Sequence, residues 1–290
     1  MLESLLYPNT VAVIGASRSP GKVGHAVVVN LINSGYQRAI IPVNPQAGTV
    51  LGLPCYASVI AYGQPIDRAV IVVPPPAVKP ALESAIRAGV KAVGVITAGF
   101  KEVGPEGAAM EQELGALCTN AGVRWMGPNC LGVLNMQHRM NATFTASQPP
   151  GGGISVISQS GALCVAILDW AVKEKLGLGK VISIGNKADL NEADFLQALA
   201  EDPDTKVIAS YLENIEDGNK FLQVAEEAAG IKPVVILKVG VTQAGAKAAS
   251  SHTGSLAGAD MAYGAAFKRA GVIRAENFEQ LFDFARAFVA

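Results

Sequence analysis

Short apolar runs alternate along this chain with segments of helical length, and no other feature restricts the fold as strongly. The apolar runs that we expect to be strands lie at residues 10–14, 39–43, 69–73, 92–96, 123–126, 154–157, 181–184, 207–211 and 234–238. The segments of helical length lie at residues 23–34, 77–88, 106–121, 163–174, 193–201, 218–229, 260–270 and 278–287. Strands that alternate with helices form βαβ units, whose strands join a parallel sheet. The 31 glycines and the hydrophobic content of 50% suit such sheets, which are buried on both faces.

A stretch rich in breaker residues divides this alternation into two series. Residues 145–153 contain two prolines and three glycines and carry no charge, a composition typical of a linker. A length of 290 residues is sufficient for two ordinary domains, each with its own core. The sequence therefore predicts an α/β protein with two doubly wound parallel-sheet domains, over residues 1–147 and 148–290.

Composition argues against several classes of function. The net charge of −1 gives no basic excess for a nucleic-acid backbone, so we expect no nucleic-acid partner. No apolar run approaches the roughly 20 residues of a membrane span, and the first residues lack the pattern of a secretory signal. The four cysteines have no metal-binding spacing, so we expect reduced thiols, no metal site and a cytoplasmic location.

A glycine-rich turn joins the first expected strand to the helix that follows it. Its candidate ligand-binding residues are Gly15, Ala16, Ser17, Lys22, Val23 and Gly24. Free N–H groups and the helix dipole at such a turn favour a phosphate, and Lys22 adds a positive charge. The glycines depart from the GxGxxG spacing, and the second strand ends in Val43 and Asn44 with no acid for a ribose diol, which argues against NAD. A nucleotide with a 3′-phosphate, such as coenzyme A, fits this turn better.

Proline and polar residues follow the next three expected strands of the first domain. They are Pro74, Pro75, Thr97 and Asn129. Ligands of open parallel sheets lie at the carboxyl ends of the strands, so these residues are expected to line the same crevice as the glycine-rich turn. The alternative is that each of them only forms a turn.

The second domain repeats the pattern of a strand, a small-residue turn and a helix. Ser158, Gln159, Ser160 and Gly161 stand at this turn, where free amides and two hydroxyls suit a phosphate, although no cation is near in the sequence. The serines could also serve only as helix caps, and capping and phosphate binding are compatible.

One histidine stands among small and hydroxylated residues, in the stretch 250–258. A neutral imidazole is a competent nucleophile toward phosphorus, and the small neighbours of His252 leave room for a phosphoryl group. Glu213, at the end of the strand 207–211, is our candidate for a carboxylate that fixes the imidazole tautomer. The alternative is a loop histidine that only satisfies local hydrogen bonds.

Taken together, these turns resemble the family of NDP-forming acyl-CoA synthetases, related to the α subunit of succinyl-CoA synthetase. The matching stretches follow the family order at residues 13–17, 42–45, 96–100, 127–130, 158–161 and 250–254. The absence of a basic residue after Pro42 makes the chain more similar to the ADP-forming acetate–CoA ligase branch than to the succinyl enzymes. The resemblance implies a Rossmann-like CoA-binding domain followed by a flavodoxin-like domain. It also implies that His252 is phosphorylated, that Glu213 stabilises it, and that residues 158–161 hold the phosphate.

The chemistry implied by the resemblance is that of an acid–thiol ligase. Acyl-CoA, phosphate and a nucleoside diphosphate are interconverted with a carboxylic acid, CoA and a nucleoside triphosphate, through an acyl phosphate and a phosphohistidine. Nothing in the sequence resembles the ATP-grasp part that binds nucleotide and Mg²⁺ in this family. We therefore expect an ATP-grasp β subunit or further C-terminal domains as the partner, and an oligomer.

Two other functions remain open on the sequence alone. The same fold could serve as a CoA- or acyl-CoA-binding regulatory module without turnover, which would need no nucleophilic histidine. An NAD-dependent Rossmann oxidoreductase is the second alternative, disfavoured by the missing acid after the second strand.

Overall fold

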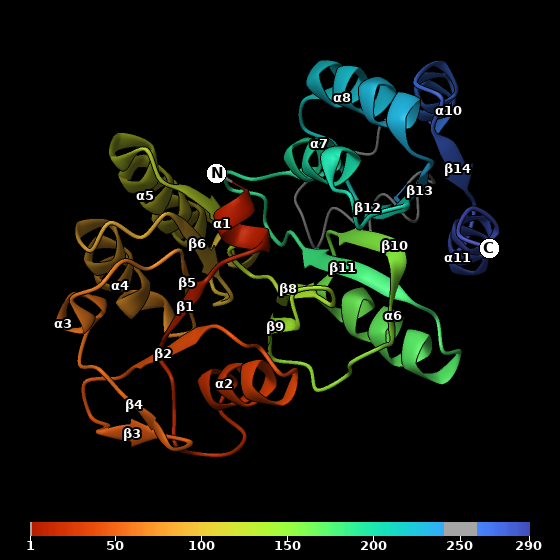
Figure 1. The fold of residues 1–290 in the computed structure, drawn as a ribbon. Coiled ribbons are helices and arrows are strands. Elements are labelled where there is room, and N and C mark those ends of the chain that lie inside the picture. The colour runs from red at the N-terminus through yellow and green to blue at the C-terminus, as the bar shows by residue number, and fades with distance from the viewer. Residues whose placement is uncertain (1, 241–259) are drawn as a thin grey trace. The chain divides into compact units, whose positions relative to one another are not determined.

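The computed structural model describes residues 2–240 and 260–290, in two compact units (Figure 1). The first unit comprises Met1–Gln148 together with Ile184–Leu190, and the second comprises Pro149–Ser183 and Asn191–Ala290. Residues 184–190 lie within the second predicted domain, whereas in the structure they belong to the first unit. The chain thus passes between the units three times.

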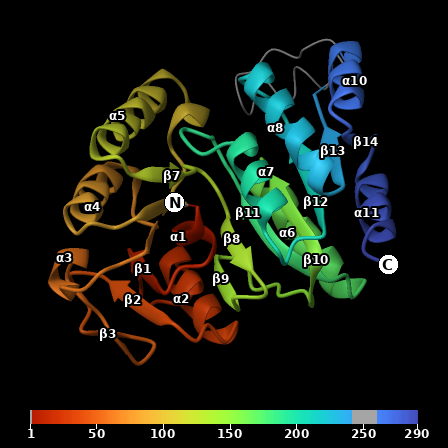
Figure 2. The same cartoon turned by 45° about the horizontal axis from the view of Figure 1, so that its top comes forward.

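The first unit contains a five-stranded parallel sheet in the order β2-β1-β5-β6-β7. Its strands are β1 (Thr10–Ile14), β2 (Ala39–Val43), β5 (Arg68–Ile71), β6 (Ala92–Val95) and β7 (Arg124–Met126). The main helices are α2 (Val23–Asn33), α4 (Pro75–Arg87) and α5 (Pro105–Ala121), with the short α1 (Glu3–Leu6) and α3 (Val59–Tyr62) (Figure 2). A short 3₁₀ helix, η1 (Lys101–Val103), precedes α5. Aliphatic side chains of the strands and of α4 form the core around the buried Trp125. Every strand predicted in this half is present, within two residues of its expected limits.

Two antiparallel ribbons in this unit were not predicted. They are formed by β3 (Thr49–Val50) with β4 (Leu53–Pro54) and by β8 (Gly132–Asn135) with β9 (Met140–Thr143). Their strands are only two to four residues long, and β8 and β9 both contain a buried asparagine. Short strands with polar buried residues give no periodic hydrophobic signal, so the sequence pattern could not reveal them.

In the second unit, parallel strands follow the order β14-β13-β12-β10-β11. They are β10 (Gly151–Ser158), β11 (Leu178–Ser183), β12 (Val207–Leu212), β13 (Val234–Lys238) and β14 (Ile273–Ala275). The helices are α6 (Gly161–Lys173), α7 (Glu192–Glu201), α8 (Gly218–Ile231), α10 (Asp260–Arg269) and α11 (Phe278–Ala287). Asn191 begins α7 through a capping box with Asp194, and Asn277 caps α11.

The linker predicted at residues 145–153 is shorter in the structure, because its three glycines form the first part of β10. Gly152 packs against Gly177, where an added Cβ would lie 2.4 Å from a backbone carbonyl carbon. The glycines therefore permit a close approach of two backbones. Their composition is that of a flexible linker, but they lie in a packed strand.

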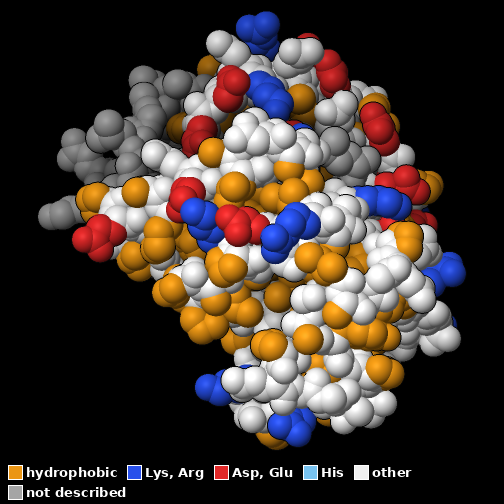
Figure 3. Space-filling model, turned by 90° about the vertical axis from the view of Figure 1, so that its left-hand side faces the viewer, with side chains coloured by type: hydrophobic (Ala, Val, Ile, Leu, Met, Phe, Trp, Pro, Cys, Tyr) orange, Lys and Arg blue, Asp and Glu red, His pale blue; other side chains and the backbone are white. Residues whose placement is uncertain are grey.

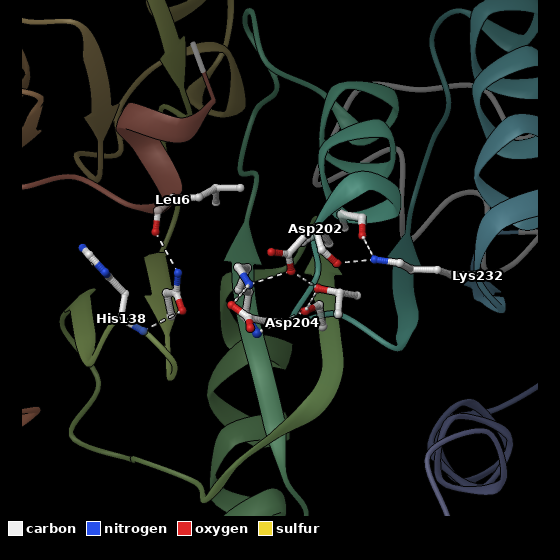
Figure 4. A network of polar contacts seen from close by, with 10 residues as sticks. Leu6, His138, Asp202, Asp204 and Lys232 are labelled. Carbon is white, nitrogen blue, oxygen red and sulfur yellow. Dashed lines mark hydrogen bonds and ion pairs between the residues drawn. The ribbon is translucent and has the colours of Figure 1, made fainter.

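Each unit also contains a network of buried polar contacts (Figure 4). In the first unit, the Asn135 side chain donates to the carbonyl of Leu6 at 2.8 Å and accepts from the backbone of His138 at 3.1 Å. In the second unit, the fully buried Lys180 places Nζ 2.6 Å from Asp202 and 3.9 Å from Asp204. Lys232 donates to the backbone carbonyl of Asp202. These contacts precede β12 and β13, so they lie at the ends of the strands opposite to the predicted ligand residues.

Charge does not gather on the surface drawn in Figure 3, where lysine and arginine side chains are interspersed with acidic and hydrophobic ones. That distribution agrees with the net charge of −1. Over residues 2–240 and 260–290, no helix is both long enough and apolar enough to cross a membrane.

Candidate ligand sites at the carboxyl ends of the strands

The glycine-rich turn of the first unit lies between β1 and α2 and is shaped by backbone packing. Gly15 has a φ of +99°, and a Cβ at this position would lie 2.9 Å from the carbonyl oxygen of Val72. A Cβ on Gly24 would lie only 2.0 Å from the carbonyl oxygen of Gly15. Only glycine permits this approach, which sets the first turn of α2 directly against the loop.

Side chains from neighbouring segments hold the same turn. The Asn44 amide, after β2, donates to the carbonyl of Ala16 at 2.7 Å. The His25 ring lies 3.0 Å from the carbonyl of Ser17 through Nδ1. Lys22 is exposed and caps α2 without a side-chain hydrogen bond. The loop therefore combines a fixed backbone, a helix start and an exposed ammonium group, the combination that suits a phosphate.

The predicted residues of this crevice differ in what they can offer a ligand. Ala16 and Val43 are buried, so they can contribute little besides backbone atoms. Pro74 is the N-cap of α4 and is exposed, and Pro75 packs against the position where Gly99 would carry a Cβ. The two prolines therefore begin α4 beside the turn that follows β6.

Thr97 and Asn129 come together at the ends of β6 and β7. The Thr97 hydroxyl donates to the carbonyl of Val73 at 2.7 Å, and the backbone N–H of Asn129 donates to the carbonyl of Thr97 at 2.9 Å. Asn129 has a φ of +58°, a conformation that asparagine tolerates better than most residues. The side-chain amide of Asn129 donates to Asn186 at 3.2 Å. Asn186 was not among the predicted residues, because it lies 57 residues further along the chain.

The serine turn of the second unit lies between β10 and α6. The Ser160 hydroxyl caps α6 by accepting from the backbone N–H of Leu163 at 3.2 Å. The Ser158 hydroxyl accepts from the N–H of Ser160 at 3.2 Å and donates to its carbonyl at 2.9 Å. Capping by a serine, left open by the sequence, is thus observed, and the Ser158 side chain is engaged within the loop. Gly161 begins α6 beside these hydroxyls.

Gln159 connects this turn to the end of β12. Its side-chain oxygen accepts from the backbone N–H groups of Glu213 at 2.9 Å and Asn214 at 3.1 Å, and its amide donates to the Asn214 side chain. The N–H of Gln159 donates to the carbonyl of Tyr211 at 3.1 Å. One side chain thereby fixes the backbone from which the Glu213 carboxylate extends.

A buried lysine, missed from the sequence, lies beside Glu213. Lys238 ends β13, is 4% exposed, and donates to the carbonyls of Glu213 at 2.8 Å and Val239 at 2.6 Å. Its Nζ also lies 4.6 Å from the centre of the Tyr263 ring. No cation is near the serine turn in the sequence, and Lys238 brings one to the end of β12 from a distant position in the chain. A charged residue that ends an apolar strand was the signal that could have revealed it.

Two ionisable side chains near this turn stay neutral at ordinary pH. Burial raises the pKa of the Cys164 thiol to about 12, against hydrogen bonds from Ser158 and Ser183. Burial, and then the charge of Glu213, raise the pKa of Tyr211. Neither side chain is therefore a nucleophile at neutral pH.

The predicted nucleophile, His252, lies outside the described residues. Among the residues that are described, no group of three or more His, Cys, Asp and Glu side chains could hold a metal ion.

Comparison with known proteins gives a match over both units. The model of a CoA binding domain matches residues 9–136, and the model of a succinyl-CoA ligase like flavodoxin domain matches residues 151–288. An acetate–CoA ligase [ADP-forming] I of Archaeoglobus fulgidus is 50% identical, over 98% of this chain and 41% of the relative. The α subunit of acetate–CoA ligase [ADP-forming] I of Pyrococcus furiosus is 45% identical, over 99% of this chain and 63% of the relative.

A solved structure agrees with these matches. The acetyl-coenzyme A synthetase 1 of Candidatus Korarchaeum cryptofilum, in complex with phosphate and ADP, has a TM-score of 0.96 and 41% identity. The match covers 100% of this chain and 62% of that chain. The chain thus spans 41% to 63% of the length of these relatives.

Proposed function

The chain belongs to the family of NDP-forming acyl-CoA synthetases as its α-subunit part, and we propose that it performs the acyl-CoA half of an acid–thiol ligase reaction. One observation carries the proposal. A single chain holds two strand–turn–helix sites of the kind that binds phosphate, one in each parallel-sheet unit. A ligase of this kind would use one such site for CoA and one for the phosphoryl group that is carried on a covalent intermediate.

The first site would bind CoA. The diphosphate would lie at the turn Gly15–Gly24, where Lys22 and the start of α2 favour negative charge. The side chain of Asn44 is occupied by the carbonyl of Ala16. The absence of an acidic residue after β2 favours CoA over NAD, because NAD-binding proteins use an Asp or Glu side chain there to bind the ribose hydroxyl. The remaining contacts would come from Ser17, Val23, Pro74 and Pro75, and from Thr97 and Asn129 at the far strand ends.

The second site would transfer the phosphoryl group through His252. Glu213 would accept a hydrogen bond from one imidazole nitrogen and leave the other free to attack phosphorus. Support comes from Gln159 and Lys238, which fix the backbone of Glu213 from two sides. The phosphate would rest at the start of α6, against Ser158, Ser160 and Gly161.

The reaction would proceed in three balanced steps. Phosphate oxygen attacks the thioester carbonyl of acyl-CoA, the C–S bond breaks, and acyl phosphate and CoA form. His252 then attacks phosphorus, the P–O bond to the acyl group breaks, and the carboxylic acid leaves. Last, a nucleoside diphosphate oxygen takes the phosphoryl group and restores the imidazole. Each step is reversible, and a covalent intermediate divides the overall transfer into easier steps.

The nucleotide and Mg²⁺ would bind elsewhere. We propose that an ATP-grasp β subunit or a C-terminal extension supplies them, and that the working enzyme is a cytoplasmic oligomer. This chain covers 41% and 63% of two longer relatives, which supports a further subunit or further domains.

Intact mass spectrometry tests the proposal. Wild type and His252→Ala are incubated with acetyl-CoA and phosphate, or with acetyl phosphate, and quenched at alkaline pH. A gain of about 80 Da in wild type only, the mass of one phosphoryl group, is the expected result. If CoA binds but neither protein gains mass, even after a candidate β subunit is added, the chain is a CoA-binding regulatory module instead.

A further inference from the structure

Residues 184–190 connect β11 to α7 of the second unit, yet they pack as an additional segment on the first. The backbone N–H groups of Asn186, Ala188 and Leu190 donate to the carbonyls of Pro128 at 2.9 Å, Gly127 at 3.1 Å and Trp125 at 3.1 Å. These three hydrogen bonds tie the segment, which is not a strand, to the end of β7 and the turn that follows it.

Two further features fix the register of this segment. The Asp189 carboxylate accepts from Arg124 at 2.8 and 2.9 Å and from the backbone N–H of Trp125 at 2.8 Å. Gly185 has a φ of +60°, and a Cβ there would lie 2.3 Å from the carbonyl oxygen of Pro128. The segment is therefore held at defined positions along the Gly127–Asn129 turn.

This register delivers the Asn186 side chain between two strand-end turns. Its amide N–H groups donate to Glu102 at 2.7 Å and to Glu111 at 2.8 Å, and its oxygen accepts from Asn129 at 3.2 Å. Asn186 is 9% exposed. A neutral amide fits because it can donate to two carboxylates and accept from a third group at the same time.

Glu102 carries the effect of Asn186 to the turn after β6. Its carboxylate accepts from the backbone N–H groups of Gly99 at 2.5 Å and Phe100 at 3.2 Å. Burial alone would raise the pKa of Glu102, but the hydrogen bonds from Asn186, Gly99 and Phe100 together lower it. The charged Glu102 carboxylate thus holds the turn that carries Thr97. Asn129 is held by a direct hydrogen bond to Asn186.

Thr97 and Asn129 lie far from the glycine-rich turn along the sheet. The order β2-β1-β5-β6-β7 places three strand spacings between β1 and β7, which is about 14 Å. A CoA whose diphosphate binds after β1 would bring its extended pantetheine arm, and the thiol at its end, toward β6 and β7.

We propose that Asn186 is a positioning residue for the thiol end of CoA, acting through Asn129 and the Glu102-held turn that carries Thr97. The inference rests on the proposed CoA site. On this proposal, the geometry of the CoA site in the first unit depends on a residue that the chain supplies between β11 and α7 of the second unit.

Calorimetric titration of the full chain tests this role with two ligands. One is CoA, and the other is its nucleotide fragment, adenosine 3′-phosphate 5′-diphosphate, which lacks the arm. Asn186→Asp, which sets a third carboxylate against Glu102 and Glu111, and the milder Asn186→Ala should each weaken CoA about tenfold and leave the fragment unchanged. Lys22→Ala is the matched control and should weaken both ligands by the same factor. An Asn129→Ala/Asn186→Ala double variant should bind CoA no more weakly than Asn129→Ala alone, because both substitutions remove the same hydrogen bond between the two side chains.

Each other outcome has a definite meaning. If wild type binds neither ligand, the proposed function fails. If wild type binds CoA and the Asn186 variants bind it equally well, the positioning role is wrong. If both variants lose the fragment as well as CoA, Asn186 only supports the fold, and the positioning role is again wrong.

Discussion

The two units build similar strand–turn–helix sites by different means. The first shapes its turn by backbone packing, with Gly24 set directly against Gly15. The second uses side-chain hydrogen bonds from Ser158, Gln159 and Ser160. The contact between Gly15 and Gly24 leaves no room for an added atom, whereas a loop held by hydrogen bonds loses one contact at a time. The two sites should therefore respond differently to substitution.

The chain offers a convenient probe of each unit, because one of its two tryptophans, Trp125, lies in the first and the other, Trp170, in the second. Urea unfolding of Trp125→Phe and Trp170→Phe backgrounds would report the free energy of unfolding of each unit separately.

The largest effect is expected from the buried ion pair of the second unit. Asp202→Ala leaves Lys180 fully buried without its nearest carboxylate, which should lower the free energy of unfolding by about 3–5 kcal/mol. Trp170 fluorescence during urea unfolding measures it. Asp204→Ala is the control: its side chain is 40% exposed and 3.9 Å from Lys180, and a loss as large as that of Asp202→Ala would contradict the assignment.

Gly24→Ala should damage the first unit nearly as strongly. The added Cβ overlaps the Gly15 carbonyl, so we expect about 3 kcal/mol of destabilisation, seen through Trp125, and loss of CoA binding. Gly115→Ala, in α5 with no atom within 4 Å of the added Cβ, should be harmless. Unchanged CoA affinity in Gly24→Ala would refute the claim that backbone packing shapes this turn.

Gln159→Leu should have a smaller effect on the second unit. It leaves the N–H groups of Glu213 and Asn214 without their acceptor, at an expected cost of about 1–3 kcal/mol. Phosphohistidine formation should fall further than stability, because the backbone of Glu213 is released. Phosphorylation measured by intact mass at a temperature where the variant is folded separates the two effects, and a full yield there would argue against this role.

Ser160→Ala should cost about 1 kcal/mol, the usual value of an N-cap. The same assay through Trp170 measures it, with Ser160→Asp as the variant that restores a cap. A loss several times larger would mean that the serine does more than cap α6.

The smallest effect concerns pH and the first unit. Burial raises the pKa of Glu111 above 4.5, against the hydrogen bond from Asn186 and the charge of Lys101. A group that binds its proton more tightly when folded stabilises the fold at low pH and loses that contribution as pH rises through the folded pKa. Glu111→Gln should therefore flatten the fall in stability as pH rises above 4.5, read through Trp125. An unchanged slope would contradict the raised pKa.

Much of this architecture could be predicted because local chemistry determines it. The apolar run of β1, Thr10–Ile14, reads as a buried strand without reference to any other segment. Glycine and proline mark the turns at Gly15 and Pro74, and serine marks the start of α6 at Ser160. Since ligands of parallel sheets bind at strand ends, the candidate residues at these turns could be chosen from local sequence.

Tertiary structure alone decided which distant residues contact the two candidate sites. Asn186 reaches Asn129 across 57 positions, and Lys238 reaches Glu213 across 25. The sequence supplies asparagine and lysine at those positions, but hydrogen bonds of this separation depend on the register of strands and on chain crossings between units. Local propensity and periodicity carry no information about such register, because it is fixed only when the sheets and their connecting segments pack together.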